Sequence, residues 1–188
     1  MSTTSTPPIL SVAAAAEAVL QGNVIAYPTE TVYGLGCRAD QASGINQIIQ
    51  AKNRDATQSF IVLVNSVAHA AEWIAPQDHP LLPQAAATWP GPTTWIFTAA
   101  EHVNPALTLQ GSIALRISPH PLAHALCQRT QCALVSTSAN LKGDPPLTNP
   151  SDIWHTFPHL ITGIMEGETG NGRPSRIIDA RSGKTLRD

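Results

Sequence analysis

Short apolar runs alternate with segments of helical periodicity along most of this chain. This alternation favours an α/β domain, in which helices pack against a sheet. The run Phe60-Ile-Val-Leu-Val64 contains no polar residue, so we expect a strand in the middle of the sheet with both faces covered. Because the sequence has no internal repeat, we predict a single α/β domain over residues 1–188, with a mixed, twisted, open β-sheet flanked by helices.

Turn and capping residues delimit the individual elements. The expected strands cover residues 24–27, 60–64, 93–98, 112–117, 133–136, 160–164, 176–179 and 185–187. The expected helices cover residues 11–21, a segment after Ser43 that ends near Lys52, residues 67–73, 81–88 and 121–129, and a short segment near Asp152. The segment Pro28-Thr-Glu-Thr-Val-Tyr-Gly-Leu-Gly36 is expected to form a loop.

The charge of the chain limits the kinds of partner that it can bind. Its formal net charge is −2 and only 13% of its residues are charged, about half the ~25% of an average domain. No Lys or Arg occurs between Arg54 and Arg116, whereas several crowd the segment from Arg173 to Arg187. The sequence therefore predicts no extended basic surface for a nucleic-acid backbone, and any positive site must be local.

The three cysteines form no CxxC pair, which indicates a reducing compartment and no zinc site. We expect them to be buried as small hydrophobic residues. No Lys or Arg precedes Arg38, so a secretory signal would lack its positive region. No apolar stretch reaches the ~20 residues of a membrane span. We expect a cytoplasmic protein with no membrane contact.

Two apparent ligand motifs do not satisfy their own requirements. Ser182-Gly-Lys-Thr185 resembles the end of a phosphate-binding loop, but Ile178 stands where that loop needs glycine. His120 and His124 have the spacing of zinc ligands on a helix, but no third ligand is evident. We therefore predict no metal ligands in the protein.

Four polar segments at the ends of expected strands and helices remain as candidates for a site. They are the loop before Gly36, the two cations of Ala51-Lys-Asn-Arg54, the lone cation Arg116 in an apolar strand, and Ser136-Thr-Ser-Ala-Asn140. Hydroxyl, amide and guanidinium groups suit the binding of anionic or polar ligands. Each segment alone is a weak signal.

The combination of motifs is more specific than any one of them. YPTETVYGLG, AKNR, WPGPTTWIF, SIALRISPHPLAHAL and STSAN occur in this order, and over residues 24–187 the chain resembles the YrdC-like threonylcarbamoyl-AMP synthases in their short, single-domain bacterial form. The resemblance implies a YrdC-like fold and a nucleotidyltransferase. Such an enzyme condenses L-threonine, bicarbonate and ATP into threonylcarbamoyl-adenylate and pyrophosphate, for the modification of adenosine 37 in tRNA.

The resemblance also implies roles for individual residues. Those matching ATP-binding positions are Lys52, Arg54, Ser112, Ser138, Asn140 and Arg187. Those matching threonine-binding positions are Thr31, Arg116, Ser136 and Ser175. Lys52 and Arg54 are also the expected catalytic residues. Asp55 and Leu63 depart from the family pattern, so the contacts of residues 58–63 are left open.

The implied reaction suggests a mechanism and partners. Threonine carbamate is already an anion, so positioning and electrostatics suffice for its attack on the α-phosphorus of ATP. We expect Mg²⁺ to accompany ATP without a dedicated protein site. The expected partners are the tRNA threonylcarbamoyl-transfer machinery, and weak binding of tRNA itself is left open. The alternative functions are an RNA-binding or tRNA-binding module without catalysis and a carbamoyl-transfer domain, but the paucity of lysine disfavours the first.

Overall fold

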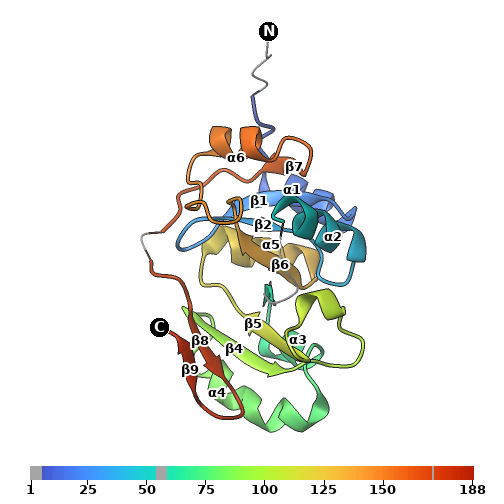
Figure 1. Cartoon of the computed structure of the whole chain (residues 1–188), viewed down its shortest axis with the longest axis vertical. Coiled ribbons are helices and arrows are strands. Elements are labelled where there is room, and N and C mark those ends of the chain that lie inside the picture. The colour runs from blue at the N-terminus through green and yellow to red at the C-terminus, as the bar shows by residue number, and fades with distance from the viewer. Residues whose placement is uncertain (1–5, 54–58, 171) are drawn as a thin grey trace.

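The computed structural model describes residues 6–53, 59–170 and 172–188. Within these ranges the strands are β1 (Val24–Pro28), β2 (Tyr33–Gly36), β3 (Ile61–Leu63), β4 (Thr93–Thr98), β5 (Ser112–Arg116), β6 (Leu134–Ser138), β7 (Ile161–Ile164), β8 (Arg176–Asp179) and β9 (Thr185–Arg187). They form one sheet in the order β7-β1-β2-β6-β3-β5-β4-β8-β9, which runs along the long axis of the molecule (Figure 1). Parallel and antiparallel pairs both occur, so the predicted mixed sheet is confirmed.

The helices fall close to their expected positions. They are α1 (Val12–Leu20), α2 (Ala42–Ala51), α3 (Val67–Ala71), α4 (Leu82–Ala86), α5 (Pro121–Thr130) and α6 (Pro150–Thr156), with 3-10 turns at Pro76–Leu81 and Pro105–Leu107. Ser11 caps α1 as predicted, because its side chain accepts a hydrogen bond from the Ala14 amide. None of the described helices is long and apolar enough to cross a membrane.

Strand β2 was wrongly expected to be part of a loop. Glycine disfavours strands, and two of its residues are Gly34 and Gly36. Gly36 is required by packing, since a Cβ there would lie 2.6 Å from Cε1 of Tyr27 and 2.7 Å from the Val135 carbonyl oxygen. Pairing with β1 and β6 compensates for the weak intrinsic strand preference of this segment.

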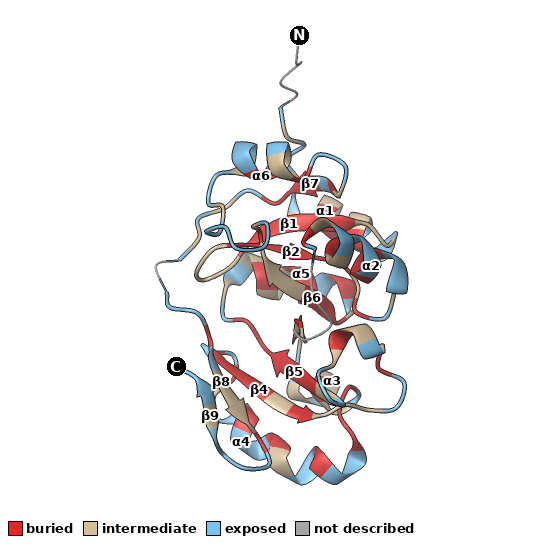
Figure 2. Ribbon diagram, in the orientation of Figure 1, coloured by how far each residue is buried: buried red, intermediate tan, exposed pale blue. Residues whose placement is uncertain are grey.

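Helices cover the two faces of the sheet unequally. On one face, α1 and α5 pack against Ile25, Tyr27 and Leu134, whose strands lie in the β7-β1-β2-β6 half. On the other face, a larger core extends under α2, α3, α4 and α6 (Figure 2). On the face that carries α1 and α5, these helices do not cover the other half of the sheet, which consists of β3, β5, β4 and β8. A cavity lies over that half.

The prediction for residues 60–64 is confirmed in position and wrong in one detail. Strand β3 occupies the middle of the sheet, and Val62 is fully buried in the larger core. Ile61 and Leu63 point to the opposite face, because side chains alternate along a strand, and both line the cavity. That face is covered only in part.

The three cysteines are free thiols. Cys37 and Cys127 are buried, and burial raises the pKa of each to about 12. They are therefore protonated at neutral pH. Cys132 is only partly buried, so the expectation of full burial is wrong for this residue.

Gly36 provides a test of this packing. We expect Gly36→Ala to lower the free energy of unfolding by about 2 kcal/mol, because the Val135 carbonyl cannot move away without disturbing β6. Gly34→Ala is the matched control, since a Cβ at position 34 meets its neighbours at 3.5 Å, an ordinary contact. Urea denaturation of both variants measures the difference, and equal transition midpoints would contradict the packing argument.

Candidate active site

A cavity of about 510 Å³ lies over the central strands on the open face of the sheet. Its floor is apolar and is formed by Ile61, Ile96, Ala114 and Ile177. Its rim carries hydroxyl groups and guanidinium groups from four separate parts of the chain, namely Thr31, Arg116, Ser118, Ser136, Ser138, Ser175 and Arg187. A volume of this size and an apolar floor with a few polar groups are typical of small-ligand sites.

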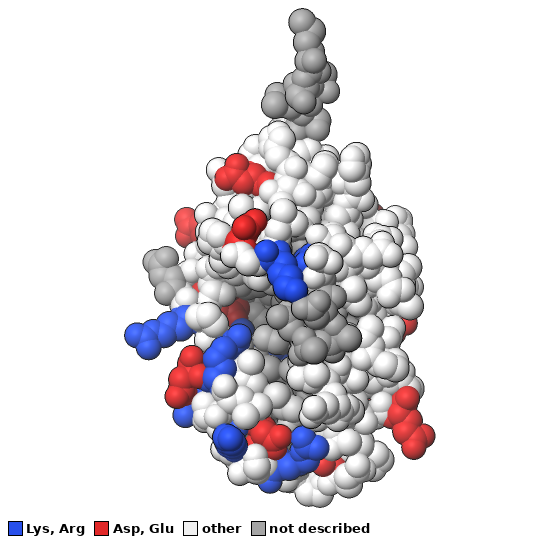
Figure 3. Space-filling view, in the orientation of Figure 1, with Lys and Arg blue, Asp and Glu red and all other residues white. Residues whose placement is uncertain are grey.

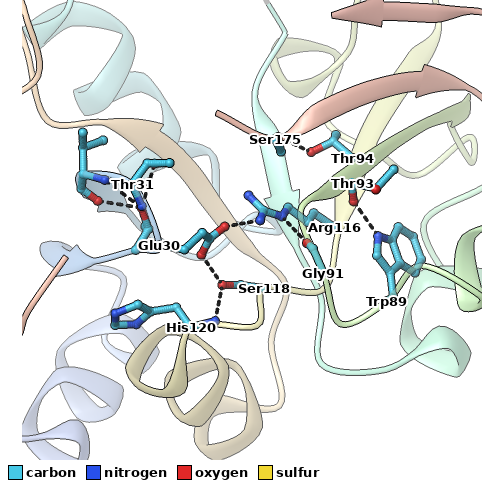
Figure 4. A network of polar contacts seen from close by, with 12 residues as sticks. Glu30, Thr31, Trp89, Gly91, Thr93, Thr94, Arg116, Ser118, His120 and Ser175 are labelled. Carbon is cyan, nitrogen blue, oxygen red and sulfur yellow. Dashed lines mark hydrogen bonds and ion pairs between the residues drawn. The ribbon is translucent and has the colours of Figure 1, made fainter. Parts of the chain in front are cut away.

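The loop between β1 and β2 supplies one wall. The Thr29 hydroxyl closes this loop by donating to the Val32 carbonyl at 2.6 Å. From outside, the amide of Gly172 donates to the Glu30 carbonyl at 3.0 Å. A Cβ at position 172 would lie 2.9 Å from that oxygen, so glycine permits the approach. The loop thereby presents Glu30 and Thr31 to the cavity (Figure 4).

Arg116 projects from the end of β5 toward this loop. Its Nε donates to the Gly91 carbonyl at 2.9 Å, and its Nη2 forms an ion pair with Oε1 of Glu30. Oε2 of Glu30 accepts a hydrogen bond from the Ser118 hydroxyl at 3.0 Å (Figure 4). The guanidinium group is thus held at two of its three nitrogens, and Nη1 has no partner among the described residues.

The cavity has a positive electrostatic character. Burial lowers the pKa of Arg116, the Glu30 carboxylate raises it, and the positive charge of Arg187 lowers it further. Burial also lowers the pKa of Arg187. Among the described lining residues Glu30 is the only carboxylate. Two guanidinium groups that repel each other across a cavity with one carboxylate favour an anionic ligand.

Arg187 is fixed at the cavity although it stands next to the C-terminus. It lies on β9, which the sequence correctly predicted as a strand. Its Nε and Nη2 donate to the Ser175 carbonyl at 3.0 Å and 2.7 Å, and Nη2 also reaches the Ser175 hydroxyl at 3.1 Å. The cluster of cations near the C-terminus is therefore more than a solvated tail at this position.

Lys52 meets Ser138 and Asn140 at one corner of the site. Its Nζ donates to the carbonyl oxygens of Ser138 and Asn140, each at 2.6 Å, and to Oδ1 of Asn140 at 2.9 Å. The Ser138 hydroxyl donates to the same Oδ1 at 2.6 Å. Ser138 lines the cavity, whereas Lys52 is not part of the lining and fixes the backbone of residues 138–140 through its hydrogen bonds. Arg54 lies outside the described residues.

Ser136 lines the cavity next to Ser138. Behind it lies Tyr27, a fully buried residue whose pKa burial raises and a hydrogen bond with Ser136 lowers in part. The phenol therefore stays protonated, and it donates a hydrogen bond to the Val135 carbonyl at 3.5 Å.

Ser112 is not among the residues that line the cavity, and its implied contact with ATP stays a prediction. It is the first residue of β5, about 13 Å along the strand from Arg116. Its hydroxyl accepts a hydrogen bond from Nη2 of Arg181 at 3.2 Å. The Arg181 side chain thereby connects Ser112 with Asp179, the last residue of β8.

Two residues of the site were missed by sequence reasoning, Glu30 and Ser118. A carboxylate between two threonines in the first polar loop was visible in the sequence, but nothing in the spacing pairs it with Arg116. The loop joins β1 to β2, and β2 is separated from β5 in the sheet by β6 and β3. Only this strand order brings the loop to the end of β5.

The described residues at the cavity offer few ligands for a metal ion. Within the described residues no three His, Cys, Asp or Glu side chains are grouped so that they could hold a metal. The carboxylate of Glu30 already serves Arg116 and Ser118. A divalent ion at this cavity would need ligand oxygens from the substrate.

Comparison with known proteins agrees with this fold. A family model named Sua5_yciO_yrdC, with the description "Telomere recombination", matches residues 17–188. The chain therefore belongs to the Sua5/YciO/YrdC family.

Individual relatives extend along nearly the whole chain. A protein of Coxiella burnetii named threonylcarbamoyl-AMP synthase is 41% identical over 181 residues, which cover 92% of this chain and 94% of that protein. A Stenotrophomonas maltophilia protein of the same name is 41% identical over 170 residues, covering 88% and 91%. The structure of P. abyssi Sua5 complexed with L-threonine is 29% identical with a TM-score of 0.79, covering 89% of this chain. This chain spans only 50% of that Sua5 chain.

We expect the ion pair of Glu30 with Arg116 to contribute to stability. Glu30→Ala leaves a guanidinium group that is only 9% exposed without its counter-ion, so we expect the free energy of unfolding to fall by about 2–3 kcal/mol. Glu17→Ala removes an exposed carboxylate from α1 and serves as the control with the same change in net charge. Chemical denaturation compares the two variants, and an equal effect would mean that the ion pair is energetically unimportant.

Proposed function

We propose that this protein is a threonylcarbamoyl-AMP synthase, which condenses L-threonine, bicarbonate and ATP into threonylcarbamoyl-adenylate and pyrophosphate. The observation that carries this proposal is the convergence of Arg116 and Arg187 on one cavity rimmed by hydroxyl groups. Relatives that bear this name are 41% identical over most of their length. An anionic amino acid and an anionic nucleotide both suit a cavity with this charge.

The threonine end of the cavity is proposed to lie at Arg116. Nε and Nη2 of this residue are taken by Gly91 and Glu30, so Nη1 is left to meet the carboxylate of the amino acid. Thr31, Ser136 and Ser175 line the same cavity and offer neutral hydrogen bonds. The ion pair with Glu30 holds the guanidinium group in place before the ligand arrives, which reduces the entropy lost on binding.

The chemistry requires little acid or base from the protein. The threonine amine adds to carbon dioxide and loses a proton, or reacts with bicarbonate with loss of water, to give a carbamate anion. A carbamate oxygen then bonds to the α-phosphorus of ATP while the bond to the departing pyrophosphate breaks. Arg187 would stabilise the negative charge that develops, and Lys52 would hold Ser138 and Asn140 against the nucleotide.

Mg²⁺ is proposed to enter with ATP, bound by the phosphate oxygens. When bound, it would neutralise part of the triphosphate charge. Glu30 is the only described carboxylate of the cavity lining and is engaged with Arg116. We therefore propose no dedicated protein ligands for the ion.

The product is proposed to pass to the tRNA threonylcarbamoyl-transfer machinery, and the reaction is proposed to take place in the cytoplasm. Direct recognition of RNA receives little support from the surface. On the face in Figure 3, Lys and Arg lie beside Asp and Glu rather than forming a continuous basic area. Arg176 pairs with Asp188 at 3.0 Å, and Arg181 pairs with Asp179 at 3.1 Å.

Turnover with purified protein tests the proposed function. We expect threonylcarbamoyl-adenylate by mass spectrometry and pyrophosphate release only when L-threonine, bicarbonate, ATP and Mg²⁺ are all present. Reactions that omit one component at a time are the controls. Equal pyrophosphate release from ATP alone would identify an ordinary ATP pyrophosphohydrolase and reject the proposal.

Arg116→Lys tests the threonine end of the cavity. Lysine keeps the charge and its pairing with Glu30 but loses the planar fork, so we expect the KM for threonine to rise about 10-fold to 100-fold while the KM for ATP changes little. Arg38→Lys is the control, because Arg38 pairs with Asp40 away from the cavity. An unchanged KM for threonine in Arg116→Lys would show that Arg116 has only a structural role and does not bind threonine.

A further inference from the structure

Thr94 lies directly behind the cavity wall and makes one side-chain hydrogen bond. It belongs to β4 and is fully buried. Its hydroxyl lies 2.8 Å from the hydroxyl of Ser175, which immediately precedes β8. Strand β8 pairs with β4 on one side and with β9 on the other, so Thr94, Ser175 and Arg187 come from three neighbouring positions in the sheet order.

The protons in this cluster have one consistent arrangement. Arg187 can only donate, so the Ser175 oxygen accepts from its Nη2 at 3.1 Å. The Thr94 hydroxyl has no partner other than Ser175 among the described residues. If Ser175 donated to Thr94, the buried Thr94 proton would lack an acceptor, which costs free energy. Thr94 therefore donates to Ser175.

The hydroxyl proton of Ser175 is then available for one hydrogen bond. Both lone pairs of its oxygen are occupied, by Arg187 and by Thr94, and the residue itself is 3% exposed at the cavity wall. Among the described residues no acceptor is left for this proton, so an acceptor within the cavity must satisfy it. A carboxylate is an acceptor without donors, and it matches this requirement.

We propose that Thr94 is a positioning residue, which orients the Ser175 hydroxyl as a donor to the carboxylate of the bound amino acid. The identity of that ligand as threonine rests on the proposed function. Thr94 itself touches no ligand, because it is not part of the cavity lining. Its effect is on the binding of the amino acid rather than on the reaction at phosphorus.

Thr94→Val tests this role, since valine has nearly the shape of threonine without its hydroxyl group. We expect the KM for threonine, and the dissociation constant from calorimetry, to rise about tenfold with kcat unchanged within about twofold. Thr94→Ser keeps the hydroxyl and should restore wild-type binding. Thr93→Val makes the same change at the neighbouring residue, whose side chain faces the opposite side of β4, and should have no effect.

A double-mutant cycle separates positioning from general damage to the site. In a Ser175→Ala background, Thr94→Val should cause no further loss of threonine affinity, because Ser175 carries the effect. Should Thr94→Val fail to fold, Thr94→Ala takes its place in the cycle.

The outcomes distinguish this inference from the proposed function. Wild-type threonine affinity in Thr94→Val, an equal loss in Thr93→Val, or additive losses with Ser175→Ala would overturn the role of Thr94. A wild-type protein that binds threonine but forms no adenylate would overturn the proposed function, while the calorimetric comparison would still decide on Thr94.

Discussion

The architecture depends on a sheet whose central strands bury one face completely and the other only in part. Side chains alternate along β3, β5 and β6, so Val62, Leu115 and Val135 enter the large core while Leu63, Arg116 and Ser136 point the other way. Helices α1 and α5 cover that second face over one half of the sheet. The cavity is the uncovered remainder, and its apolar floor and polar rim follow from the same alternation.

Two guanidinium groups organise this cavity from opposite sides. Arg116 is held by Gly91 and Glu30, and Arg187 is held by Ser175. In both cases a backbone carbonyl accepts a hydrogen bond from Nε. This bond fixes the side chain, and because a carbonyl is neutral, the positive charge of the guanidinium group is not neutralised by it. The site is thus preorganised for an anion, and the C-terminal strand is part of it rather than an appendage.

Much of this could be read from the sequence because it depends on local patterns. The period-two strand at residues 185–187 placed Arg187 on a strand, and the apolar run at residues 60–64 placed β3 in the middle of the sheet. Strand β2 escaped prediction because its glycines suit a turn in isolation, and Gly36 is explained only by its tertiary contacts with Tyr27 and the Val135 carbonyl. Ser112 and Arg116 share a face of β5 but stand at opposite ends of it, so motif order alone did not show how far Ser112 lies from the cavity.

The sequence by itself determined the class of fold, the approximate elements and the residue types of the site, because hydrophobic periodicity and motif order are properties of neighbouring residues. Only the tertiary structure decided which of those residues meet. The ion pair of Glu30 with Arg116, the support of Ser138 by Lys52, and the bond of Thr94 to Ser175 each join segments far apart in the chain. Their partners are selected by strand order and register, which no local pattern encodes.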